Sequence, residues 1–318
     1  MIEQNKNIAV LQNEITSLEK LSAQNYLYSS AKKFKALQII LSVVVIVIIS
    51  FLKIIFEKKN SEVLLGMNWN MVSPYFSLLS VLVTIVNVYI LKSIISQKIK
   101  LASLIQYDFD TYVMNINKNI IYQENCPPYE DIWKYSLKNK KKGYPPDFFK
   151  DWYSPYVDSL DKSVSNFICL KTNLVWDMNL RTIYRNSILI LLILLSVLLL
   201  IPSFILGVTI KSFTLEVLIP LMPLFTFSIS EIMDNNKTIL NKKRIKTIID
   251  LTWDRILSKT IFIDELSKLS KECLEYLIIL RRENPIIFDW FFNLTKKSSN
   301  DEMNYSADRL IKEYKNRS

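Results

Sequence analysis

The chain has 318 residues, of which 50% are hydrophobic and 22% are charged, with only 3 Gly and a formal net charge of +10. This composition is too apolar for an average soluble domain and too charged for a chain buried wholly in lipid. We therefore expect one part to lie in a membrane and another in water. The sequence has no His, which excludes His-based acid–base catalysis, His metal ligands and Ser-His-Asp arrangements. The three cysteines lack C-x-x-C spacing, so we expect neither a zinc site nor a disulfide framework.

Residues 1–35 are expected to form a cytoplasmic region. Apolar residues recur at spacings of three and four from Ile8 through Leu11, Ile15, Leu18 and Leu21, which predicts an amphipathic helix over 8–35 that runs towards the membrane. A long polar stretch precedes the first apolar run and no small-residue cleavage site follows it, so a signal peptide is not expected.

Four stretches reach the roughly 20 mostly apolar residues that a membrane-spanning helix needs. They pair into a first hairpin over 36–93 and a second over 186–233, the latter with a connection as short as Lys211-Ser212. The spans are residues 36–56, 63–91, 186–210 and 213–233. The predicted fold is an all-α membrane protein with four transmembrane helices in two hairpins and helical cytoplasmic regions.

The distribution of Lys and Arg around the spans predicts their orientation. These residues are frequent before the first and third spans and after the second and fourth, whereas the loop after the third span has only Lys211. Because positive residues favour the cytoplasmic side, we expect both termini and the middle region 94–185 in the cytoplasm, with two short loops outside. The protein is then a multi-pass protein of the plasma membrane.

The two longer cytoplasmic regions, 94–185 and 234–318, are predicted to be mainly helical. Helical patterns cover 94–122 and 237–283, and a helix from about Lys162 runs on into the third span. Between Cys126 and Pro155, proline pairs predict a turn-rich insert. Its basic run Lys138-Asn139-Lys140-Lys141-Lys142-Gly143 is suited to phosphate but lacks the P-loop pattern; a solvated loop is the alternative interpretation.

Ordered residue runs along nearly the whole chain resemble those of the SMODS-associated four-transmembrane effector family. The runs are Ile8-x-x-x-Gln12-Asn13, Leu21-Ser22-Ala23-Gln24, Leu27-Tyr28-Ser29, Ala31-Lys32, Asp151-Trp152-Tyr153, Cys169 to Asn173, Trp176-Asp177, Leu180-Arg181 and Tyr184, then Pro220, Pro223, Glu231, Arg281-Arg282 to Pro285, Asp289-Trp290-Phe291 and Met303-Asn304-Tyr305. The sequence departs from the family pattern at Asn25, where a basic residue is expected, and at Phe288.

The resemblance implies a bacterial antiphage effector of the inner membrane, encoded beside a nucleotidyltransferase. That enzyme makes a cyclic oligonucleotide, the activating ligand, and the effector then forms a pore or disrupts the membrane in abortive infection. Besides the lipid bilayer, the implied partners are this ligand and further copies of the chain, because one chain has too few polar positions in its spans to line a pore. No catalytic residue, metal, other cofactor, DNA or RNA is expected.

A cyclic oligonucleotide needs cations for its phosphates and flat side chains for its bases. The candidate ligand-binding residues are Lys140, Lys141, Lys142, Trp152, Tyr153, Trp176, Arg181, Arg185, Arg281 and Arg282. For the aromatic residues the alternative is packing between the two cytoplasmic regions.

Polar residues and prolines within the spans are the candidates for a pore or a gate. They are Thr84, Asn87, Pro202, Glu216, Pro220 and Pro223. The prolines can equally kink packed helices without a gating role, and Glu216 can be an interfacial acid at a helix N-terminus.

Two other classes of function remain as alternatives. The first is a non-conducting membrane scaffold or adaptor that binds a partner protein through its cytoplasmic helices. The second is an enzyme at the membrane surface that uses carboxylates such as Asp147, Asp151 and Asp177, which the missing His disfavours.

The predicted topology can be tested by cysteine labelling in intact cells. Cysteines introduced at Ser61 and Ser212, in the two loops, should react with a membrane-impermeant maleimide, because the flanking charges place these loops outside. Permeabilised cells provide the control for full reactivity. Protection of both sites until the membrane is opened would invert the topology.

Overall fold

The computed structural model describes residues 7–41, 63–64, 67–68, 75, 78, 82, 85–205, 207, 209–288, 291 and 305–317. Helices make up nearly all of these residues, so the all-α prediction is confirmed. Two short strands, β1 (Val63–Leu64) and β2 (Met67–Asn68), form an antiparallel ladder in which Val63 pairs with Asn68 and Leu64 with Met67. The second span was predicted to begin at Val63, where the backbone is instead extended.

The chain divides into two compact units. Unit 1 comprises residues 1–31, 96–183 and 235–318, and unit 2 comprises residues 32–95 and 184–234. Four helices contribute residues to both units: α2 (Ile15–Ile39), α5 (Lys92–Met114), α8 (Lys162–Ile205) and α10 (Ile219–Leu257).

The single helix predicted over 8–35 is two helices, α1 (Ile8–Gln12) and α2. The interruption follows from Asn13, whose side-chain amide donates to the carbonyl of Ala9 at 3.0 Å and to Oδ1 of Asp151 at 2.9 Å. Asn side chains that bond nearby backbone in this way compete with helix hydrogen bonds. Asn13 thereby ties the end of α1 to the segment before α8.

The helix predicted over 94–122 ends earlier, because α5 stops at Met114 and Asn115 has a left-handed φ of 51°. After α6 (Ile120–Glu124) the chain forms α7 (Tyr129–Lys140), where a turn-rich insert was predicted. Pro128 caps α7 at its N-terminus with a φ of −61°, a position where proline needs no amide hydrogen. The 3₁₀ helices η3 (Pro146–Phe149) and η4 (Pro155–Ser159) complete this segment.

Helix α8 runs without interruption from Lys162 to Ile205, which confirms the prediction of one helix entering the third span. A turn at α9 (Ile210–Ser212) and the π-helix η5 (Phe213–Leu218) lead into α10, which is equally continuous. Within the described residues, one helix, Lys162–Leu198, is long and apolar enough to cross a membrane, and only 17% of its apolar stretch is buried. The first two spans lie mainly outside the described residues, so four spans stay a prediction.

The helical pattern predicted over 237–283 is interrupted after Leu257, where Lys259 takes a φ of 56°. Helix α11 (Ile263–Glu283) then ends at Asn284, as predicted from Asn284-Pro285. A last helix covers residues 305–317.

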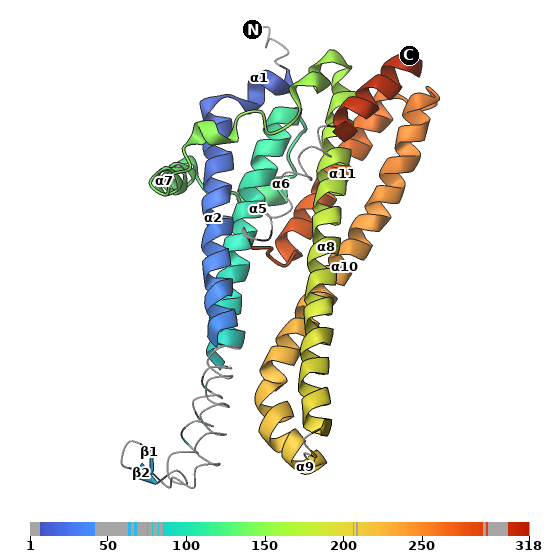
Figure 1. The fold of residues 1–318 in the computed structure, drawn as a ribbon. Helices are drawn as coiled ribbons and strands as arrows, with labels where there is room; N and C mark the ends of the chain where they lie inside the picture. The colour runs from blue at the N-terminus through green and yellow to red at the C-terminus, as the bar shows by residue number, and fades with distance from the viewer. Residues whose placement is uncertain are drawn as a thin grey trace. The chain divides into compact units, whose positions relative to one another are not determined.

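Unit 1 has one main hydrophobic core, to which every long helix of the unit contributes. Its fully buried side chains include Leu21 of α2, Phe109 of α5, Phe167 of α8, Ile249 of α10 and Leu274 of α11. A smaller cluster joins α7 to α2 and α5 through Ala23, Leu27, Ala102, Ile105 and Ile132. Figure 1 shows α7 on the outer side of α2, with α5 next to α2.

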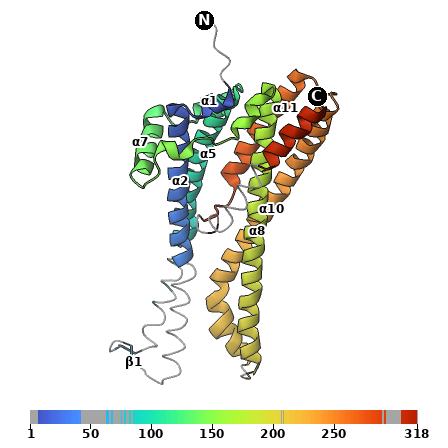
Figure 2. The ribbon, with the colours of Figure 1, turned by 45° about the horizontal axis from the view of Figure 1, so that its top comes forward.

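Unit 2 contains a helical hairpin made by residues 184–205 of α8 and the first part of α10 (Figure 2), joined at α9, which is labelled in Figure 1. Lys35 of α2 and Glu231 of α10 form an ion pair within this unit, with 2.7 Å between Nζ and Oε2. Both side chains are buried, so the pair joins α2 to α10 within unit 2.

Candidate functional site

Four side chains at the contact between α2 and α7 form what we call the tyrosine–lysine cluster: Tyr26, Tyr135, Lys138 and Lys142. The rings of Tyr26 and Tyr135 stack with centroids 5.9 Å apart. The Nζ atom of Lys142 lies 4.0 Å from the centroid of Tyr26, and Nζ of Lys138 lies 5.9 Å and 5.8 Å from the two ring centroids. The rings are half-buried and both lysines are exposed. The cluster thus offers flat aromatic surface and positive charge at one place.

The helix register explains why these side chains converge. Residues three and seven positions apart lie on one helix face, so Tyr135, Lys138 and Lys142 project to the same side of α7 and the turn that ends it. Asn139, next to them, is buried, and its Nδ2 donates to Oγ of Ser22 at 3.2 Å. This hydrogen bond fixes the last turn of α7 against α2.

The interior of unit 1 holds a buried ion pair between Asp110 of α5 and Arg281 of α11. The distance between Oδ2 of Asp110 and Nη1 of Arg281 is 2.5 Å, and the other carboxylate oxygen accepts a hydrogen bond from the hydroxyl of Tyr153 at 2.6 Å. Asp110 is completely buried and Arg281 is 9% exposed. Burial, together with the neighbouring Asp110, raises the pKa of Tyr153 well above its usual value, so this hydroxyl stays a donor.

The main chain of Tyr153 is fixed as firmly as its hydroxyl. Gln12 accepts from the Tyr153 amide at 2.8 Å through Oε1 and donates to the Tyr153 carbonyl at 3.1 Å through Nε2. The Tyr153 ring also stacks on Phe109 with centroids 6.2 Å apart. Tyr153 therefore connects α1, α5 and the segment before α8.

A second buried group surrounds Arg181 of α8. Its Nε donates to Oδ2 of Asp177 at 2.8 Å, and Nη1 donates to the carbonyl of Pro285 at 2.8 Å and to Oδ1 of Asn235 at 3.4 Å. Nζ of Lys242, which belongs to α10, lies 2.5 Å from Oδ2 of Asp177. Arg181 therefore holds α8, α10 and the end of α11 together within unit 1.

The two buried groups act on each other electrostatically. Tyr28 is influenced by charges of both buried groups. Burial raises its pKa to about 12, Arg281 and Arg181 oppose this shift, and Asp177 and Asp110 add to it. Burial also lowers the pKa of Lys242, whose charge is favoured by Asp177 and disfavoured by Arg181 and Arg281. We call the ensemble of Asp110, Asp177, Arg181, Lys242 and Arg281 the buried ionic network. It contains three cations and two carboxylates, all in the described part of unit 1.

The structure separates the predicted ligand-binding residues into exposed and buried sets. Lys140 and Lys141 are exposed at the end of α7, next to Lys142. Tyr153 and Arg281 meet at Asp110, whereas Arg181 lies in the second buried group. The remaining four residues are half-buried: Trp152, Trp176, Arg185 and Arg282. Trp152 packs on the main core, and Arg185 donates to Oδ1 of Asn186.

The predicted pore residues lie largely in parts of unit 2 whose side chains the structure leaves undescribed. Thr84 lies outside the described residues. Asn87 belongs to the π-helix η2 (Val86–Leu91) and Glu216 to the π-helix η5. Pro202, in α8, and Pro220 and Pro223, in α10, lie within helices. Their role in a pore stays a prediction.

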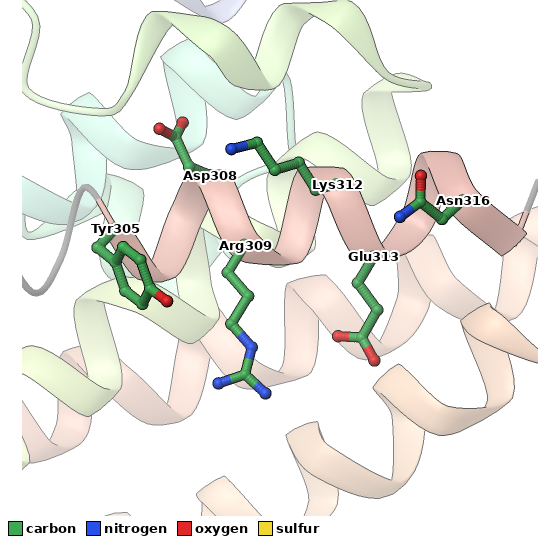
Figure 3. A pocket seen from close by; sticks show the side chains of 6 residues that line it. All are labelled: Tyr305, Asp308, Arg309, Lys312, Glu313 and Asn316. Carbon is green, nitrogen blue, oxygen red and sulfur yellow. The ribbon is translucent and has the colours of Figure 1, made fainter.

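The helix over 305–317 carries a hollow of about 430 Å³ on its surface. Figure 3 shows the side chains that line it, which include Arg309 and Lys312 as well as Asp308 and Glu313. Oε2 of Glu313 also accepts from Nε1 of Trp253 at 3.3 Å. Because the charges of the lining side chains balance, the hollow does not favour a polyanion.

The sequence did not identify four residues of the cluster and of the buried ionic network: Tyr26, Tyr135, Asp110 and Lys242. A helical assignment to 129–140 would have placed Tyr135 on the same face as Lys138 and Lys142. The contacts of Tyr26, Asp110 and Lys242 join distant segments, so no local pattern reveals them.

A family model described as the SMODS-associating 4TM effector domain matches residues 6–310. The match therefore covers both units and every long helix described above. No curated protein and no solved structure matches the chain.

The Asp110 ion pair should contribute strongly to the stability of unit 1. Asp110→Ala leaves the Arg281 guanidinium buried without its carboxylate, so we expect a loss of about 3–5 kcal/mol in the free energy of unfolding. The measurement is thermal unfolding of the detergent-solubilised protein, followed by tryptophan fluorescence.

The matched control is Asp147→Ala, which removes a carboxylate from an exposed pair with Lys150 and should leave the melting temperature unchanged. Adding Arg281→Met to Asp110→Ala should recover part of the loss, because the unpaired charge is then gone. Equal melting temperatures for Asp110→Ala and Asp147→Ala would contradict the assignment.

Proposed function

Because the chain belongs to the SMODS-associating 4TM effector domain family, we propose that it is a membrane effector which a cyclic oligonucleotide activates in an antiphage signalling system. Activation makes the protein oligomerise or rearrange, so that it forms a pore or disrupts the bacterial inner membrane and ends the infection with the death of the cell. The family match over residues 6–310 is the observation that carries this proposal.

The surface of α8 supports a location in lipid. Between Leu189 and Ile205 the helix exposes a run of large apolar side chains, with Phe204 at 89% and Leu198 at 69% exposure. Apolar surface of this extent is unfavourable in water and favourable in a bilayer. Arg185 and Lys211 flank the run at its two ends, where their charges can reach the headgroups.

The continuity of the long helices supports transmission of a signal from unit 1. Helix α8 carries Asp177 and Arg181 of the buried ionic network and continues into its apolar run, and α10 carries Lys242 and continues from the second hairpin. A change of helix position in unit 1 therefore acts on backbone that belongs to the same hydrogen-bonded helices in unit 2. A ligand can drive such a change only through its different affinity for the two states, and a switch from mostly closed to mostly open needs about 5.5 kcal/mol.

The proposal can be tested by dye release from liposomes that contain the purified full-length protein. Addition of cyclic oligonucleotides from a panel should release the dye, whereas the protein alone should retain it. Liposomes without protein, given the same nucleotides, are the control. Binding of a cyclic oligonucleotide with no release would favour the non-conducting scaffold.

The oligomeric state gives an independent test. One chain has few polar positions in its apolar segments, so a water-filled path requires several copies. Chemical cross-linking in mild detergent should therefore yield multimers, at least when the activating nucleotide is present. A strict monomer with and without nucleotide would argue against a pore.

A further inference from the structure

We propose that the tyrosine–lysine cluster is a nucleotide site, in which a base stacks on Tyr26 and the phosphates contact Lys138, Lys142 and the adjacent Lys140 and Lys141. The inference rests on the proposed function, since it assigns the place where the cyclic oligonucleotide binds. It also changes the assignment made from the sequence, because only the lysines of the predicted set belong to this site.

The position of Lys142 indicates that one face of the Tyr26 ring is available to a ligand. The Lys142 ammonium group, on an exposed side chain, lies 4.0 Å from the centroid of Tyr26, closer than the ring of Tyr135 at 5.9 Å. A base can occupy the place of this ammonium group, because stacking on an aromatic ring is tolerant of base identity. Lys142 can then turn to the phosphate, to which it forms a stronger, charge-assisted hydrogen bond.

Three of the lysines near these rings have no carboxylate partner in the described part of the chain. Residues 132–146 contain no Asp or Glu, and within the described residues Lys138, Lys140 and Lys141 form no ion pair. The lysines on either side differ in this respect, because Lys134 pairs with Asp131 at 3.1 Å and Lys150 pairs with Asp147 at 2.8 Å. Of the first three lysines, Lys138 lies 5.9 Å and 5.8 Å from the two ring centroids.

The backbone holds the lysines in a defined turn. After α7 the amides of Lys142 and Tyr144 both donate to the carbonyl of Asn139, at 2.9 Å and 3.2 Å. Gly143 closes this turn with a φ of 91°, a value that a residue with a side chain rarely adopts. Asn139 itself is bonded to Ser22 of α2. A ligand therefore meets cations whose backbone is already ordered, which reduces the entropic cost of binding.

The other groups of cations in unit 1 are less suited to a polyanion. Arg181 and Arg281 are buried and bonded to Asp177 and Asp110, so a nucleotide would have to displace internal carboxylates. At the hollow on the helix over 305–317, Arg309 and Lys312 stand beside Asp308 and Glu313.

The site also lies on a helix that leads directly to the first predicted span. Tyr26 precedes Ala36 by ten residues of the continuous helix α2, or about 15 Å along its axis. Tyr28, two residues further on, is under the electrostatic influence of Arg281, Arg181 and Asp177. A ligand that joins Tyr26 to the lysines of α7 therefore acts on α2 near both the buried ionic network and the membrane segment.

The test is nucleotide binding to the full-length protein in lipid nanodiscs, measured by isothermal titration calorimetry. The probes are cyclic di-AMP, cyclic di-GMP and cyclic tri-AMP. Tyr26→Ala, and the combined change of Lys140, Lys141 and Lys142 to Ala, should each weaken binding about tenfold or more. Tyr26→Phe should bind like the unchanged protein, because stacking needs the ring and not the hydroxyl.

Two control variants match the changed side chains in type. Lys134→Ala removes an exposed lysine from α7, and Tyr156→Ala removes an exposed tyrosine from η4; both should bind like the unchanged protein. A melting temperature within experimental error of the unchanged protein shows that a variant is folded. Tyr26→Phe keeps the aromatic ring and its packing, so it tests the role of the ring separately from folding. Higher NaCl should weaken binding in the unchanged protein more than in the triple lysine variant.

The outcomes separate this site from the proposed function. Equal affinity of the cluster variants and the controls, or absence of binding by all three probes, overturns the site. If the cluster variants still release dye when nucleotide is added, the site is overturned, but the proposed membrane function is not. Binding that depends on Tyr26 and the lysines, without dye release, supports the site and overturns the membrane-permeabilising function.

Discussion

Asp110 accepts hydrogen bonds from Tyr153 and Arg281 in the interior of unit 1, and the surrounding helices depend on this arrangement. Arg281 is 171 residues away in sequence, and Tyr153 is in turn bonded through its main chain to Gln12. A buried carboxylate without such donors costs several kcal/mol. Helices α1, α5 and α11 are thus held in the one arrangement that satisfies the Asp110 carboxylate.

The need to pair buried charges also explains why the arginines and the lysines of unit 1 differ in their surroundings. Arg181 and Arg281 each present several donors in a fixed plane. Arg281 donates to Asp110 of α5, and Arg181 donates to the carbonyl of Pro285, just after the end of α11. They join segments that are far apart in sequence. One donor atom, Nη2 of Arg281, finds no hydrogen-bond partner within the described part of the chain. The side chains of Lys138, Lys140 and Lys141 at the end of α7, by contrast, are exposed and join no second helix through an ion pair in the described part of the chain.

The sequence was sufficient for features that depend on local periodicity. The unbroken course of α8 follows from an apolar run with charged residues on its N-terminal side, and the end of α11 follows from Asn284-Pro285. Helix α7 was not predicted, because prolines at both ends and a lysine-rich stretch resemble a loop. Pro128 nevertheless occupies a position at the start of α7, where helices tolerate proline. Asn13 and Asn115 interrupt predicted helices through a side-chain hydrogen bond and a left-handed backbone.

The candidate site could be predicted only in part, because its partners come from distant segments. Lys140 to Lys142 were identified from their charge, but Tyr26 lies more than one hundred residues before them. Arginine is a residue type that often binds phosphate, but Arg281 is buried and its guanidinium is paired with Asp110. Neither the stacking of Tyr26 on Tyr135 nor the pairing of Arg281 has a signature at short sequence separation.

The π-helices η2 and η5 adjoin α5 and α10 within unit 2. A π-helical turn bonds residue i to i+5, so it accommodates one residue more than an α-helical turn. Conversion of either segment to α-helix changes the register of the adjoining helix by one residue, which amounts to a rotation of about 100° and an advance of about 1.5 Å. The backbone amides are hydrogen-bonded within the helix both before and after such a change. Asn87 lies in η2 and Glu216 in η5, so a register change in these segments acts at two of the positions predicted for a pore.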